Sequence, residues 1–174
     1  MGKLTLATEG DRHVIVTRHF AASPRLVFRA CSEPDLIQQW LLGPDGWTMQ
    51  VCLVDFRPGG SFRYEWANAQ GAGFHITGEF IDIVPDRRIE HVERMHMPDA
   101  TPENHIATTF APSGDGTLMT LRMTLPDAKT RALLLGTGMA DGMEASYARL
   151  EPLLSRGLNA GMDVAATRNG ETRA

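Results

Sequence analysis

The alternation of hydrophobic and polar residues predicts that much of this chain forms β-strands. Residues 12–20 place Val14, Val16 and Phe20 on one face, which is typical of a strand. From Trp47 to Met123 the same period recurs, and no helical period is sustained for three turns. Turn signals divide this region at RPGG, PDRR and PSGDG, so it predicts six antiparallel strands.

Helical patterns interrupt the strands once and follow them at the end. Ser23 with Pro24, and then Ser32 with Pro34, are typical of helix starts and predict two short helices in succession. After Pro126 apolar residues recur every three or four positions, which predicts one long amphipathic helix ending near residue 157. Its apolar face would consist of Leu135, Met139, Met143, Tyr147, Leu150 and Leu154.

The order of these elements predicts an α+β fold. A curved, seven-stranded antiparallel sheet would wrap around the long C-terminal helix, with the two short helices after the first strand. Because a twisted sheet cannot contact a straight helix along its whole length, we expect a cavity between them. We assign residues 11–157 to this one domain, residues 1–10 to a flexible N-terminus and residues 158–174 to a disordered tail.

Two glycines and two methionines recur four residues apart within the predicted final helix. Glycine inside a helix costs about 1 kcal/mol relative to alanine, so a packing reason is expected for Gly138 and Gly142. On one continuous helix they would let the helix approach the sheet or the first helices closely. Met139 and Met143, one position further round, would form a flexible roof over the cavity.

Composition argues against several classes of protein. Lysine and arginine number 17 against 21 aspartates and glutamates, and neither sign forms a long run, so no nucleic-acid partner is expected. No apolar run approaches the ~20 residues that span a bilayer, so no membrane partner is expected. With no secretory signal before them, Cys31 and Cys52 are expected to be reduced thiols in a cytoplasmic protein.

Six stretches resemble, in order, the motifs of the family named for the activator of Hsp90 ATPase. This family belongs to the START-like (SRPBCC) superfamily, which includes Bet v 1 and polyketide cyclases. The stretches are ASPRLVFRACSEPDLIQQW, GPDGW, VCLVDFRPGGSFRY, GEFIDIVPDRRI, GDGTLMTLRMTL and GMADGMEASYARLEPLL, and the resemblance covers about residues 12–155. It implies a helix-grip fold with a hydrophobic cavity. The co-chaperone's additional N-terminal domain has no counterpart in these residues, so an Hsp90 interaction is not expected.

The candidate acid–base residues lie on the predicted strand RIEHVERMHM. Alternation places His91 and Glu93 on the same face as Ile89 and Met95, so all four point inward if the apolar pair does. Residues two apart on a strand are ~7 Å apart along it, which allows a shared water or a direct contact. The alternative is that both polar residues lie at a rim or on a solvent face.

No cofactor and no metal site are expected from the remaining polar residues. His75 and His105 lie on the parity opposite to their apolar neighbours and are predicted to point outward. The stretch HMPDATPENH is interpreted as a polar hairpin loop rather than as a metal site. Cys52 is expected to be a packed thiol, and Arg122 to point outward near the cavity mouth, where it could anchor a ligand carboxylate.

The aromatic and methionine residues define the predicted ligand cavity, although the same residues could simply fill a core. Nine methionines favour an adaptable pocket, because methionine fits irregular contents. The predicted lining comprises Trp40, Trp47, Phe62, Tyr64, Trp66, Phe74, Phe80, His91, Glu93, Met95, Met119, Met123, Met139 and Met143.

Three hypotheses of function follow from these observations. The first is a protein that binds a hydrophobic or aromatic small molecule in the cavity. The second is a cyclase- or hydrolase-type enzyme that uses His91 and Glu93. The third is a protein-interaction module similar to the Hsp90 co-chaperone. A homodimer is compatible with each of them.

Overall fold

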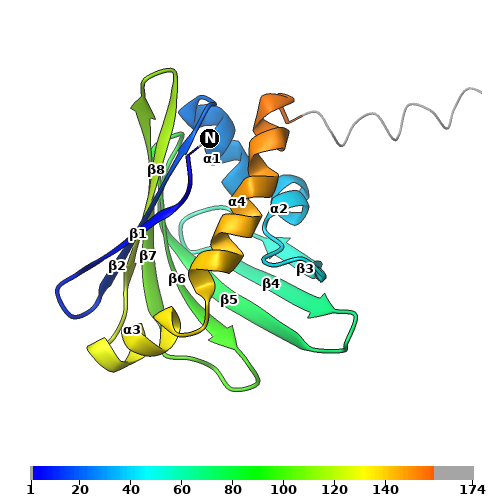
Figure 1. Ribbon diagram of the computed structural model, residues 1–174, viewed down its shortest axis with the longest axis vertical. Helices are drawn as coiled ribbons and strands as arrows, with labels where there is room; N and C mark the ends of the chain where they lie inside the picture. The colour runs from blue at the N-terminus through cyan, green and yellow to red at the C-terminus, as the bar shows by residue number, and fades with distance from the viewer. Residues whose placement is uncertain (1, 159–174) are drawn as a thin grey trace, which may run out of the picture.

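A curved antiparallel sheet wraps around helix α4 in the computed structural model, which describes residues 2–158 (Figure 1). The strand order across the eight-stranded sheet is β1-β2-β8-β7-β6-β5-β4-β3. The predicted α+β helix-grip fold is therefore confirmed. The predicted disordered tail lies, after Leu158, outside the described residues. The elements in chain order are β1 (Thr5–Glu9), β2 (His13–Phe20), α1 (Pro24–Ser32), α2 (Pro34–Trp40), β3 (Trp47–Val54), β4 (Ser61–Asn68), β5 (Gly73–Val84), β6 (Arg88–His96), β7 (Asn104–Ser113), β8 (Gly116–Thr124), α3 (Ala128–Leu135) and α4 (Met139–Ser155).

The sheet has one strand more than the seven predicted. The extra strand, β1, lies where we expected a flexible N-terminus, and it pairs with β2 from Thr5 opposite Thr17 to Glu9 opposite His13. Its side chains are nearly all exposed, so no alternation of apolar and polar residues marks it in the sequence. Backbone pairing with β2 holds this edge strand in place, and of its side chains Leu6 packs partly against the core.

Helices α1 and α2 follow the first long strand, as predicted. Ser23 caps α1, because its side chain accepts a hydrogen bond from the backbone N–H of Leu26. The similar role expected for Ser32 is wrong: its hydroxyl donates to the carbonyl of Arg29, and Glu33 is the residue that precedes α2. The two helices therefore share one junction residue, Glu33, which ends α1 and begins α2.

The long final helix expected after Pro126 is two helices, α3 and α4. Gly138, between them, has φ = 76°, a left-handed conformation that ends helical progression and that glycine adopts at little cost. The expectation that Gly138 and Gly142 share one helical face is therefore wrong, since only Gly142 lies within α4. Gly142 lies against the loop after α2, where an added Cβ would be at an ordinary contact distance of 3.6 Å from Cδ of Pro44, so there is room for alanine but little for a larger side chain.

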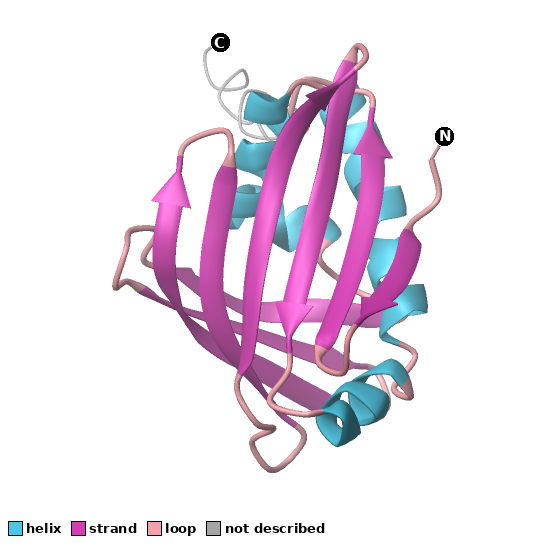
Figure 2. Cartoon of the chain, turned by 90° about the vertical axis from the view of Figure 1, so that its left-hand side faces the viewer, coloured by secondary structure: helices cyan, strands magenta, loops and turns pink. Residues whose placement is uncertain are grey.

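The sheet bends around α4 with the help of two irregular pairings. The register shifts between Met49 and Val51 in the β3–β4 pair, and between Phe80 and Asp82 in the β5–β6 pair. Such bulges increase the local twist of a strand pair. Figure 2 shows the outer face of the sheet in front, with the helices behind it.

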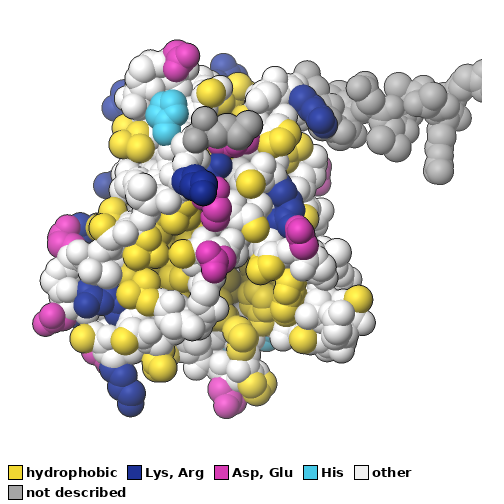
Figure 3. Space-filling view, in the orientation of Figure 1, with side chains coloured by type: hydrophobic (Ala, Val, Ile, Leu, Met, Phe, Trp, Pro, Cys, Tyr) yellow, Lys and Arg dark blue, Asp and Glu magenta, His cyan; other side chains and the backbone are white. Residues whose placement is uncertain are grey.

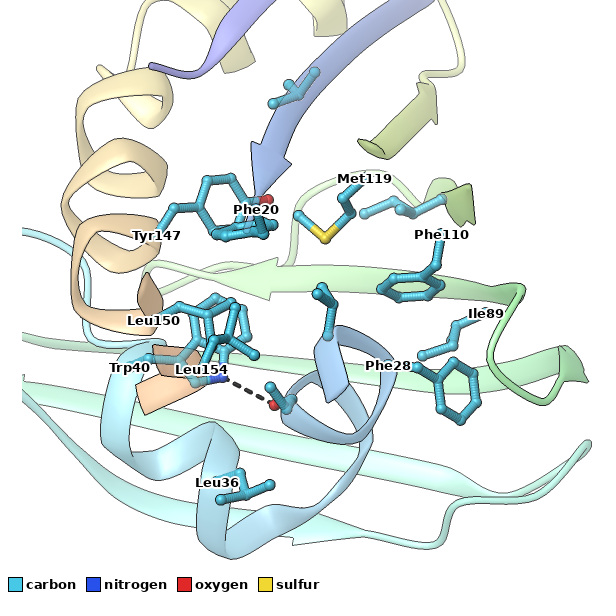
Figure 4. Packing of buried hydrophobic residues seen from close by; sticks show 14 of the residues in the cluster. Phe20, Phe28, Leu36, Trp40, Ile89, Phe110, Met119, Tyr147, Leu150 and Leu154 are labelled. Atoms are coloured by element: carbon cyan, nitrogen blue, oxygen red, sulfur yellow. Dashed lines mark hydrogen bonds between the residues drawn. The ribbon is translucent and has the colours of Figure 1, made fainter. Parts of the chain in front are cut away.

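The C-terminal half of α4 closes one end of the core (Figure 4). Tyr147, Leu150 and Leu154 are at most 5% exposed, and the Tyr147 ring packs against Phe20 and Trp40 with centroids 5.8 and 5.9 Å apart. The indole N–H of Trp40 donates to the carbonyl of Ala30 at 2.9 Å, which ties α2 to α1. By contrast, Met139 and Met143 at the start of α4 are only partly buried. The helix is therefore fixed at its C-terminal end.

A buried arginine joins α4 to the first long strand. Arg18 of β2 is 3% exposed and donates to Glu144 at 2.5 Å and to Glu151 at 2.9 Å, both on α4. Its guanidinium also lies over the rings of Phe20 and Tyr147, 5.6 and 5.9 Å from their centroids. Since the two carboxylates lie two helical turns apart, Arg18 sets how α4 lies across β2.

Candidate functional site

A cavity of about 470 Å³ lies between the inner face of the sheet and the N-terminal half of α4. In the space-filling view, apolar side chains gather on both sides of α4, where this cavity opens to the surface (Figure 3). The structure places every residue of the predicted lining on it: Trp40, Trp47, Phe62, Tyr64, Trp66, Phe74, Phe80, His91, Glu93, Met95, Met119, Met123, Met139 and Met143.

Linked aromatic rings form the wall of the cavity on strands β3 to β5. Trp66 stacks on Phe74 with centroids 4.8 Å apart, and Phe74 in turn meets Trp47 edge-on at 5.3 Å. Tyr64 lies between Trp66 and Phe62, with centroids 5.9 and 5.1 Å away. Rings that support one another in this way, with few rotatable bonds, form a surface that is largely fixed before any ligand arrives.

The roof of the cavity is less rigid than its wall. Met139 and Met143 of α4 project there, together with Leu134 of α3 and the residues around Gly138. Methionine has three rotatable side-chain bonds and no branching, so it can follow the outline of different contents. The cavity therefore combines a fixed aromatic wall with an adaptable roof.

His91 and Glu93 bring an imidazole and a carboxyl group into the lining. Both project inward from β6, and Nε2 of His91 lies 3.0 Å from Oε2 of Glu93. Their side chains are 16% and 21% exposed, so the contact is shielded but not sealed. The other ring nitrogen of His91, Nδ1, is enclosed and has no hydrogen-bond partner among residues 2–158. The carboxylate thus has the more open position of the two.

Asn104 and Thr108 of β7 extend the polar part of the lining. Asn104 lies directly opposite Glu93 in the β6–β7 pairing, and Thr108 lies opposite Ile89. Asn104 is 9% exposed, and its Oδ1 is enclosed without a partner in the described part of the chain. A buried amide oxygen without a hydrogen bond costs about 1–3 kcal/mol, so Oδ1 of Asn104 gains no stabilising contact from the described protein groups.

The thiols and phenols near the cavity stay uncharged at neutral pH. Burial raises the pKa of Cys31, a lining residue, to about 12. Burial, with the charge of Asp35, raises the pKa of Cys52 to about 11. Burial likewise raises the pKa of Tyr64 and of Tyr147. These groups can donate hydrogen bonds, but the thiols lack the thiolate character of a nucleophile.

Other predicted polar residues lie away from the cavity. We expected Arg122 near the cavity mouth, but it points from β8 toward β1 and binds Glu9 at 2.7 Å. His105 also has a protein partner, because its Nε2 lies 2.8 Å from Oε1 of Glu90. The rings of His75 and His96 stack on each other, with centroids 4.2 Å apart. Each of these side chains is engaged by a protein neighbour rather than by the cavity.

Sequence reasoning missed several residues of the lining. Asn104 could have been found, because it shares its parity along the strand with Ile106 and Phe110. Cys31 and Tyr147 lie on helices, where a wide buried face makes the assignment of one position to a cavity ambiguous. Arg18, which does not line the cavity, shares its parity with Val16 and Phe20, and this pattern marks it as an inward-facing charge.

Comparisons with known proteins agree with this architecture. The family model described as Activator of Hsp90 ATPase homolog 1-like protein matches residues 21–155. A crystal structure of a protein from Rhodobacter sphaeroides has a TM-score of 0.83 at 26% identity and covers 88% of this chain and 99% of its own. For an uncharacterized protein from Rhizobium leguminosarum, the TM-score is 0.66 at 27% identity, with coverage of 90% and 99%.

A third solved structure shows the same fold at lower identity. Protein Ms6760 from Mycobacterium smegmatis has a TM-score of 0.78 at 20% identity, and the match covers 87% of this chain and 96% of that one. The comparison with curated proteins gives no match. Among residues 2–158, no helix has the length and apolar character needed to cross a membrane.

Proposed function

The chain belongs to the Activator of Hsp90 ATPase homolog 1-like family, and from this premise we propose that it binds a hydrophobic or aromatic small molecule. The ligand would lie between the aromatic wall and α4. The observation that carries this proposal is the cavity of about 470 Å³, which is within the range of small-molecule sites. A docking module needs no such internal space, and therefore we favour ligand binding over protein interaction.

The lining explains how such a ligand would be held. Each ~100 Å² of apolar ligand surface removed from water contributes about 2.5 kcal/mol, before the cost of association is subtracted. The preformed wall of Trp66, Phe74 and Tyr64 reduces that cost, because these rings are already ordered by one another. The methionine roof would then close over ligands of somewhat different outline.

A fluorescence titration tests this proposal. Phenylnaphthylamine, a neutral aromatic dye that brightens in apolar surroundings, should bind the purified protein at one saturable site. Met143→Trp places a larger side chain under the roof and should weaken binding by at least about tenfold. Ile81→Trp is the matched control, because Ile81 is 45% exposed and does not line the cavity.

Two results would contradict the proposal. One is an absence of saturable dye binding by a protein that is folded by circular dichroism. The other is equal weakening by Met143→Trp and Ile81→Trp, since this would place the dye outside the cavity.

A second candidate function is proton transfer on a carbonyl substrate, which the 3.0 Å contact between His91 and Glu93 favours. In this reaction Glu93 would remove a proton from the carbon next to the carbonyl, and His91 would orient the carboxylate. The test is deuterium uptake by β-tetralone, an apolar ketone, followed by NMR in D₂O. Exchange above the buffer rate that is lost in Glu93→Gln supports an enzyme, whereas exchange at the buffer rate argues against it.

A further inference from the structure

We propose that the cavity selects ligands by a hydrogen-bond-donating group, a hydroxyl or an amine, which binds Glu93, and that it rejects carboxylates. This inference rests on the proposed ligand binding and specifies the chemistry of the ligand.

The lining holds a carboxylate but no permanent cation. Within residues 2–158, no lysine and no arginine line the cavity. The buried Arg18 contacts the Tyr147 ring and is bound by two carboxylates, Glu144 and Glu151. Arg149, near the same end of α4, binds the carbonyl of Gly43 and the carboxylate of Asp45. An anionic ligand would therefore meet no lysine or arginine side chain in the cavity, and burial of a charge without such a partner is costly.

One oxygen of Glu93 remains free to bind a ligand. Its Oε2 is engaged by Nε2 of His91, which also fixes the direction of the carboxylate. Its Oε1 has no hydrogen-bond partner among the described residues, and the side chain lines the cavity. His91 itself is unavailable, because Nε2 is engaged and Nδ1 is enclosed. A ligand donor therefore meets Glu93 first.

The neighbours of Glu93 leave its carboxylate between an aromatic ring and an amide. On one side β5 presents Gly78, and the space that a side chain would fill holds the ring of Phe62: a Cβ at Gly78 would lie 2.2 Å from Phe62 Cζ. On the other side β7 presents Asn104. Tyr64 lies near Glu93. Burial is the largest cause of the raised pKa of Tyr64, followed by Cys52 and then by Glu93. The carboxyl group of Glu93 thus faces the aromatic part of the cavity.

Four naphthalene derivatives of similar size test the inference. Methylnaphthalene reports apolar binding alone, while naphthol, naphthylmethylamine and naphthoic acid add a neutral donor, a cation and an anion. Affinities are measured by displacement of phenylnaphthylamine. Naphthol and naphthylmethylamine should bind at least about tenfold more tightly than naphthoic acid, the ratio expected for one charge-assisted hydrogen bond gained or one unpaired charge buried.

The variant Glu93→Gln keeps the shape of the side chain and removes its charge. It should weaken naphthylmethylamine binding by about tenfold, strengthen naphthoic acid binding, and leave methylnaphthalene unchanged. Glu90→Gln is the matched control, because Glu90 lies on the same strand but contacts His105 on the outer face. If Glu93→Gln does not fold, the order of the four affinities in the unaltered protein still decides the question.

Three other outcomes would contradict the inference, and they separate a failure of selection by Glu93 from a failure of ligand binding itself. If methylnaphthalene binds but naphthoic acid binds as tightly as naphthol, selection by Glu93 is overturned while ligand binding stands. The same holds if Glu93→Gln changes no affinity more than Glu90→Gln does. If none of the four compounds displaces the dye and the dye itself does not bind, the inference and the proposed function fail together.

Discussion

Replacement of the buried Arg18 by methionine should lower stability through the contact between β2 and α4. Arg18→Met keeps an apolar side chain of similar length but leaves Glu144 and Glu151 without the guanidinium that binds both of them. Removal of one partner from a fully buried ion pair costs about 3–5 kcal/mol. Because Glu144 and Glu151 are 36% and 20% exposed, water can partly hydrate them, so we reduce this to about 2–3 kcal/mol.

The assays are urea unfolding and thermal unfolding, each followed by circular dichroism. For a chain of this size, the expected loss corresponds to a fall in melting temperature of roughly 4–12 °C. Arg122→Met is the matched control, because its partner Glu9 is 60% exposed and such pairs contribute about 0–1 kcal/mol. Addition of Glu144→Gln to Arg18→Met should restore part of the lost stability by removing one of the unpaired charges.

The ion pair between Arg18 and Glu144 also predicts that the stability of the fold depends on pH. Burial opposes ionisation of Glu144, but the hydrogen bonds from Arg18 and from the N–H of Leu4 outweigh it and lower its pKa. A lowered pKa stabilises the folded state above the ordinary value of about 4.3, and this stabilisation is lost as the pH falls through the folded value. The difference between the unaltered protein and Arg18→Met should therefore be full above about pH 5 and shrink below about pH 4.

Two results would refute this reasoning. If Arg18→Met lowers the unfolding free energy no more than Arg122→Met does, the buried ion pairs contribute little to stability. A stability difference that stays constant from pH 7 to pH 3 would show that Glu144 is not the group that depends on Arg18.

Three further predictions concern α4, the thiols and the polar lining. Gly142→Leu should clash with Pro44, lower the unfolding free energy by about 1–3 kcal/mol and reduce dye affinity, whereas Gly142→Ala should be tolerated in both assays. With pKa values of about 12 and 11, Cys31 and Cys52 should react with iodoacetamide at pH 8 far more slowly in the folded protein than in urea, and equal rates would contradict their burial. Asn104→Leu removes a buried oxygen without a partner and should raise or preserve the melting temperature, so a large fall would show that the amide makes a structural hydrogen bond.

The alternation of apolar and polar residues predicted most of the strands, and the elements that it did not predict were missed for physical reasons. The pattern predicted β2 and the six strands from β3 to β8, because one face of each is buried. It could not predict β1, because nearly all of its side chains are exposed. The apolar spacing ran through Gly136, Thr137 and Gly138, so it predicted one helix where the left-handed Gly138 separates two. In this segment the local chemistry of the glycines outweighed the periodicity of the apolar residues.

The lining of the cavity follows from the same parity rule, whereas its polar contacts depend on tertiary structure. Once Ile89 is known to face inward, the inward direction of His91 and Glu93 follows from their spacing. The 3.0 Å contact between them, and the isolation of Asn104, depend on rotamers and on the neighbouring strand. Arg122 was misplaced for a similar reason, since its partner Glu9 belongs to the strand that the pattern did not reveal.

The division of α4 into a fixed end and a roof separates two kinds of evolutionary constraint. Tyr147, Leu150 and Leu154 hold the helix in place, and a change there endangers the whole molecule. Met139 and Met143 pack against the core but stay partly exposed, so a change there removes less buried surface than a change at the fixed end. Proteins with this scaffold can therefore differ in what they recognise by changes at these two positions, whereas Glu144 and Ser146 in the same turns are held by Arg18 and by the N–H of Gly43.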